Sequence, residues 1–198
     1  MKVQYFKIYI DHHKLMGVIK VELKYIRYGI VLALLSILFG GLLGLSFGCC
    51  EDNIKSLLKE KAATVLIEKY AGKQELADKV IKKSWVYIKR AHFHSQTMGI
   101  ISIVFSLLVA WLKFPPKLQF GISFFSGFGS LGYGFFWLSA ALLAPGLGST
   151  GAAKDSVELL AQGSAGPFFI SCVGLFGFLI YKMFVKNEPA KVQTRYAK

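Results

Sequence analysis

The chain has 198 residues, 54% of them hydrophobic, and its mean hydropathy is +0.49. This apolar content exceeds that of an ordinary soluble domain of the same length and favours a membrane protein. The formal net charge is +13, but the cations are spread over both ends and over a segment that also holds six acidic residues. This distribution favours membrane lipid as the partner and argues against binding to nucleic acid.

Residues 1–27 mix aliphatic, aromatic and lysine residues at irregular spacing. Such a pattern predicts an interfacial segment that lies on the membrane before the first span. The run from Tyr28 to Gly48 contains no charged residue and is long enough to cross about 30 Å of hydrocarbon. A cleaved signal peptide is not expected, because the preceding segment is too long for an n-region and the run is too long for an h-region.

Residues 50–94 are expected to form a helical hairpin outside the membrane. Asp52 and Asn53 can cap its first helix, in which apolar residues approximate helical spacing, and Gly72 can end it. A second helix is expected to start near Gln74. Because no strong breaker follows for many residues, we expect this helix to run unbroken into the second span.

The second span covers about Ser95 to Leu112, and Trp111 is placed as an interfacial anchor. The third, about Leu118 to Ala144, is rich in aromatic residues and glycine. It is expected to end at the pair Pro145-Gly146, since both residues interrupt helices.

The fourth span, about Pro167 to Val185, is expected to open with proline in its first turn. Lys182 and Lys186 close it, and their long side chains can reach the membrane surface. The sequence thus predicts an all-α integral membrane protein with four transmembrane helices in one domain, 28–185, followed by a tail, 186–198.

The distribution of basic residues predicts the orientation. Outside the long 50–94 loop, the side that holds both termini carries thirteen lysines and arginines and the other side carries one. Basic residues in short flanks and loops favour the cytoplasm, whereas long loops cross largely regardless of charge. We therefore expect a multi-pass protein of the cell membrane with both termini in the cytoplasm.

Glycine is frequent in two of the expected spans. Gly40, Gly44 and Gly48 recur at every fourth position of the first span. The third span has four glycines and several aromatic residues close together: Gly127, Gly129, Gly132 and Gly134 beside Phe128, Tyr133, Phe136 and Trp137. Two interpretations stay open: close approach of helices in this bundle or a neighbouring subunit, or space for a flat cofactor.

Two histidines stand at the start of the second span, His92 and His94. Neutral imidazole is a strong ligand for haem iron, copper and zinc. Residues two apart on a helix point about 200° away from each other, so we expect a single inward histidine. His94 is the preferred candidate, with Met98 one turn further as a second axial ligand. The remaining histidines, His12 and His13, fall on the opposite side of the membrane in the expected topology.

The same side of the membrane gathers a candidate copper or zinc set. Its members lie at the ends of the first two spans and in the last outer loop: Cys49, Cys50, Glu51, Asp52, His92, His94, Asp155 and Glu158. The competing interpretation is that these are interfacial residues, with structural histidines bonded to carbonyls. Neighbouring cysteines bond to each other only with strain, so separate fates are expected for Cys49 and Cys50. Cys172 is expected as a small packing residue.

The run RAHFHSQTMG, which leads into an apolar helix, resembles the histidine-bearing helix starts of haem-copper oxidase catalytic-subunit-like proteins. It also resembles small uncharacterised bacterial membrane proteins with an Ala-His-x-His signature. The resemblance implies that His92 or His94 ligates haem b or copper in a respiratory setting. The chain departs from the oxidase pattern in having four spans and no further intramembrane histidine, so oxygen reduction is not implied.

The leading functional hypothesis is a small subunit of a larger respiratory or electron-transfer assembly, holding haem or a metal at its outer side. One alternative is a structural or assembly subunit without a cofactor, and another is a copper- or zinc-binding membrane protein. The sequence shows no Ser-His-Asp set and no paired carboxylates within the spans. We therefore do not expect this chain to be a catalyst on its own. Other membrane subunits or further copies of the chain are the expected protein partners.

Overall fold

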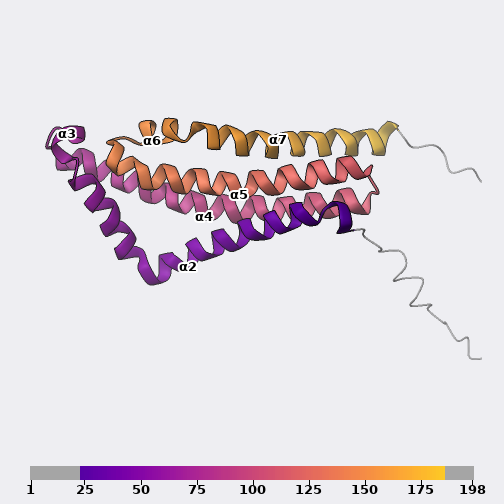
Figure 1. Cartoon of the computed structure of the whole chain (residues 1–198), viewed down its shortest axis with the longest axis horizontal. Helices are drawn as coiled ribbons and strands as arrows, with labels where there is room; N and C mark the ends of the chain where they lie inside the picture. The colour runs from indigo at the N-terminus through magenta and orange to yellow at the C-terminus, as the bar shows by residue number, and fades with distance from the viewer. Residues whose placement is uncertain (1–22, 186–198) are drawn as a thin grey trace, which may run out of the picture.

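The computed structural model describes residues 23–185, and regular structure in this range is entirely helical (Figure 1). The elements in chain order are η1 (Leu23–Tyr25), α2 (Arg27–Ala63), α3 (Leu66–Tyr70), α4 (Gln74–Trp111), α5 (Pro116–Leu147), α6 (Thr150–Ser156), α7 (Glu158–Ile180) and the π-helical turn η2 (Tyr181–Val185). Most of the expected interfacial segment, with His12 and His13, lies outside the described residues, as do Lys186 and the tail.

Four helices are long and apolar enough to cross a membrane: α2, α4, α5, and α7 with its extension to Phe184. The predicted all-helical fold with four such helices is therefore confirmed. The prediction that a helix starting near Gln74 runs unbroken into the second apolar segment is also confirmed, because α4 is continuous over 38 residues. The polar stretch between the first two apolar runs is helical apart from its turns.

The antiparallel helices α4 and α5 form the centre of the bundle (Figure 1). They are joined by a short turn in which Lys113 takes a left-handed conformation, φ 53°, and Pro115 caps the start of α5. Helix α2 packs on both central helices, and α7 packs along α5 on the opposite side of the bundle. Helices α3 and α6 lie at one end, which we call the α3 end (Figure 1).

Helix α2 is bent at Cys50, whose backbone leaves the helical region with φ −138° and ψ 18° (Figure 1). The expected caps Asp52 and Asn53 lie beyond the bend, inside the helix, because the break falls earlier than their positions suggest. After the bend, Leu58 and Ala62 are buried in the apolar cluster at the α3 end. The bend thus brings the polar half of α2 back onto the bundle.

Two expected helix ends are wrong. Helix α5 continues through Pro145 to Leu147 and is capped by Gly148, which takes φ 77°. Tertiary contact holds this last turn, since Pro145 is buried and its carbonyl accepts a hydrogen bond of 2.7 Å from the Tyr70 hydroxyl. Pro167 does not open the fourth long helix, because α7 begins nine residues earlier, at Glu158.

The interior changes in character along the bundle. One apolar cluster fills the α3 end, around Leu58, Tyr87 and Trp137, and a second fills the opposite end, around Ile26, Val109 and Ile122. Between them, buried serines line the helix contacts: Ser36, Ser95, Ser102, Ser106, Ser123, Ser126 and Ser130. Their short side chains allow the helices to approach closely while bonding to backbone carbonyls.

Several glycines of these helices are contact points between neighbours. A Cβ added to Gly29 would lie 2.1 Å from Ser123 Oγ, and one at Gly127 would lie 2.4 Å from the Gly29 carbonyl oxygen. Hydrogen bonds cross the same contacts, from Ser36 Oγ to the Ser95 carbonyl at 2.8 Å and from Ser123 Oγ to the Ile26 carbonyl at 3.0 Å. The packing interpretation therefore holds for Gly40, Gly44 and Gly127, whereas an added Cβ at Gly48 meets no atom of the described residues within 4 Å.

Candidate functional site

The two histidines at the start of the second apolar segment face different helices. His92 points to α2, where its Nδ1 lies 2.6 Å from the Gly40 carbonyl oxygen. Its ring covers Gly44, at which an added Cβ would meet the imidazole Cε1 at 2.7 Å. Phe47 packs edge-on against the same ring, with 5.4 Å between centroids. Within the glycine repeat of α2, Gly44 thus makes room for the His92 ring.

His94 points to α5. Its ring stacks on Trp137, at 6.1 Å and 15° between planes, and meets Tyr133 edge-on at 5.2 Å. The expectation that His94 faces the bundle is confirmed. The expectation that only one histidine faces the bundle is wrong, because α4 has neighbouring helices on two nearly opposite sides. Phe93, which stands between the two histidines, is 62% exposed.

Trp137 is the centre of a cluster of aromatic and basic side chains at the α3 end. The Arg90 guanidinium lies 4.9 Å from the Trp137 ring centroid, and Tyr87 packs edge-on at 4.8 Å. The buried indole Nε1 has no hydrogen-bond partner among the described residues. An unpaired buried donor costs about 1–3 kcal/mol, so an acceptor within hydrogen-bond distance of this nitrogen would be stabilised. Met98 lies one turn beyond His94, and its carbonyl accepts a hydrogen bond of 2.8 Å from Ser102.

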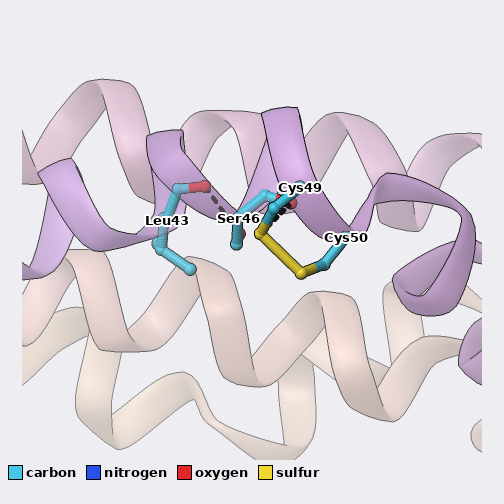
Figure 2. The surroundings of a disulfide bond; sticks show 4 residues. All are labelled: Leu43, Ser46, Cys49 and Cys50. Carbon is cyan, nitrogen blue, oxygen red and sulfur yellow. Dashed lines mark hydrogen bonds between the residues drawn. A yellow bond between two sulfur atoms is a disulfide. The ribbon is translucent and has the colours of Figure 1, made fainter.

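The neighbouring cysteines at the bend of α2 are joined to each other (Figure 2). The expectation of separate fates is therefore wrong. The two Cα atoms are 3.8 Å apart, and the non-helical backbone at Cys50 allows the side chains to meet. Ser46, one turn earlier, donates to the Leu43 carbonyl at 2.6 Å. Cysteine binds copper or zinc as the thiolate. The two sulfur atoms of this disulfide are not thiolates.

The acidic members of the expected metal set are dispersed. Glu51 forms an ion pair with Lys55 on the next turn, Asp52 is exposed, and Glu158 accepts a hydrogen bond of 2.7 Å from Gln162. Across residues 23–185, no three histidine, cysteine or acidic side chains lie close enough together to hold a metal ion.

Cys172 is exposed on α7, not packed, because its side of the helix has no neighbour within the described bundle.

Comparison with protein-family models, with curated proteins and with solved structures gives no match.

The sequence predicted the two histidines as site residues but not the side chains that they contact. Arg90 could have been recognised as a neighbour of His94, since the two stand four residues apart on a helix. Trp137 could not, because its meeting with His94 depends on how α4 and α5 align.

Proposed function

We propose that this chain is a multi-pass membrane protein with both termini in the cytoplasm, and that it is a small subunit of a larger membrane assembly. The distribution of side chains carries this proposal. Buried helix contacts contain glycine and serine, whereas large apolar side chains cover the outside: Leu38 is 58% exposed and Leu45 is 72% exposed. Such an exterior is unfavourable in water and favourable in lipid, where small residues hold helices together.

The length of α4 supports the same topology. Trp85 and Trp111 are 26 positions apart on this helix, or about 39 Å at a rise of 1.5 Å per residue. This is close to the roughly 40 Å of a bilayer with its headgroups, and tryptophan favours both interfaces. Trp111 then lies at the cytoplasmic surface, and Trp85 and the α3 end lie at the outer one.

Helix α7 supports a role as a subunit. It packs along α5 but leaves its far side open. Away from α5, four glycines have no atom of residues 23–185 within 4 Å of an added Cβ, in contrast to Gly127 and Gly129 of α5: Gly163, Gly166, Gly174 and Gly177. At about 100° per residue these four fall within one narrow side of the helix. We propose that a transmembrane helix of another subunit contacts α7 here.

The test is photo-crosslinking in native membranes. A photoreactive amino acid at Ile170, which falls on the same side of α7 and is 69% exposed, leaves the glycines in place. It should form a covalent adduct with a second polypeptide, whose mass identifies a further copy of this chain or another protein. The matched control is Phe176 on the same helix, which is 64% exposed and points away from the glycines; it should label lipid. If both positions label only lipid, α7 is not the contact, and if both give the same polypeptide adduct, the contact is not specific to the glycine side.

A second candidate function is ligation of haem or a metal ion at the outer end, in an electron-transfer setting. One observation favours His92 as the ligand. If its Nδ1 donates its proton to the Gly40 carbonyl, at 2.6 Å, then Nε2 carries the free lone pair, as in metal-binding histidines. Oxidised and reduced visible spectra with metal analysis test this candidate. A signal that disappears in His92→Ala but not in Phe93→Ala supports it, and a signal that both variants retain contradicts it.

A further inference from the structure

A pocket of about 410 Å³ lies between the part of α2 beyond its bend and the first half of α4. Figure 1 shows these two segments converging toward α3. Three lysines, one carboxylate and two apolar side chains line the pocket: Lys55, Lys59, Lys82, Asp78, Ile81 and Trp85. None of these residues belongs to the histidine sites described above.

The lysines that line the pocket differ in whether they form an ion pair. Lys55 is paired with Glu51, and its Nζ lies 5.3 Å from the centroid of the Trp85 ring. Lys59 and Lys82 are exposed and form no ion pair with any residue of the described range 23–185. Asp78 accepts a hydrogen bond of 3.0 Å from Gln74. Two ammonium groups therefore border the pocket without an anionic partner.

The floor of the pocket is apolar. Ile81 is only 7% exposed, and Trp85 packs edge-on against Phe47 with 5.3 Å between centroids. Phe47 stands at the end of the first apolar run and Trp85 at the outer membrane surface, so in the proposed topology this floor lies in the outer headgroup region. Lys82 precedes Trp85 by less than one turn, so its long side chain can reach the lipid phosphates.

We propose that this pocket binds a phosphate-bearing anion. Lys59 and Lys82 contact the phosphate oxygens, because charge-assisted hydrogen bonds to an anion are the strong ones. Trp85 and Ile81 pack against the apolar part of the ligand. The phosphate can come from an anionic lipid headgroup or from a free phosphate compound, and the lipid source rests on the membrane topology proposed above.

Native mass spectrometry of the full chain in a neutral detergent tests this site. The probes are phosphatidylglycerol, phosphatidylcholine and inorganic phosphate. The double variant Lys59→Gln/Lys82→Gln should weaken phosphatidylglycerol binding at least about tenfold. The control Lys83→Gln/Lys89→Gln removes the same charge from exposed positions outside the pocket and should bind like the unmodified protein.

The outcomes separate the sources of the phosphate. If phosphatidylglycerol binds more tightly than phosphatidylcholine and inorganic phosphate does not displace it, the ligand is a lipid headgroup. If inorganic phosphate displaces it at equal concentration, the ligand is a free phosphate. An equal loss in both double variants, or no loss in either, overturns the proposal. Because this assay does not involve α7, it can fail independently of the crosslinking experiment.

Discussion

Replacing Gly127 by alanine should push α5 and α2 apart. The new Cβ would lie 2.4 Å from the Gly29 carbonyl oxygen, whereas ordinary contacts of a Cβ begin at 3.4 Å, so the helices must separate by the difference of 1.0 Å. The oxygen belongs to the backbone of a helix and cannot rotate away. The same movement would stretch the nearby hydrogen bond from Ser123 to the Ile26 carbonyl, now 3.0 Å, beyond its useful range.

The expected cost follows from these contacts. Overpacking costs about 1–3 kcal/mol, and the lost interhelical bond adds about 0.6 kcal/mol in a membrane protein. Alanine returns up to about 1 kcal/mol, because it is the better helix former. The variant should therefore lose about 0.6 to 3.6 kcal/mol in its free energy of unfolding.

Reversible unfolding in mixed micelles, followed by circular dichroism, measures this loss. The matched control is Gly121→Ala on the same helix, where an added Cβ meets no atom within 4 Å. This control should be neutral or more stable by up to about 1 kcal/mol. Equal stabilities for the two variants would refute the close approach of α2 and α5 at Gly127.

Two further predictions concern Tyr70 at the α3 end, and a third concerns the three cysteines. Tyr70→Phe leaves the Pro145 carbonyl without its donor and should cost about 1 kcal/mol, while Tyr181→Phe, at a 53% exposed position, should cost nothing. Burial also raises the pKa of Tyr70, so the folded state holds the phenolic proton more tightly. This contribution to the free energy of unfolding is complete below about pH 10, the pKa of tyrosine in the unfolded chain. It is lost as the pH rises through the higher pKa of the folded state. If the free energy of unfolding of Tyr70→Phe depends on alkaline pH in the same way, the assignment is contradicted. Maleimide labelling of the denatured chain should add one group before reduction, at Cys172, and three after it, whereas three before reduction would exclude the Cys49–Cys50 bond.

The long helices could be predicted because their signals are local. No proline interrupts the chain between Gln74 and Trp111, and α4 is continuous over this range. The ends of α5 and α7 could not be placed the same way. Pro145 is kept inside a helix by contact with Tyr70, which lies 75 positions away in the chain, and no local pattern contains that information.

The candidate site likewise contains features that local sequence predicts and features that depend on contacts between distant residues. Helical geometry predicts that His92 and His94 point in nearly opposite directions. Which helix each of them contacts depends on how the helices pack around α4. The pairing of Cys49 with Cys50 depends on the bend of α2. General strain arguments about neighbouring cysteines apply to regular backbone and therefore predicted the opposite.

Glycine has two different roles in this chain that sequence alone does not separate. At Gly29 and Gly127 a neighbouring backbone already occupies the space, whereas at Gly174 and Gly177 the space is open. Substitutions at the first pair should therefore lower the stability of the bundle. Alanine at the second pair should change its association while leaving its stability unchanged or up to about 1 kcal/mol higher. Measuring unfolding and crosslinking on the same variants tests this division directly, because a single cause such as helix propensity would move both quantities together.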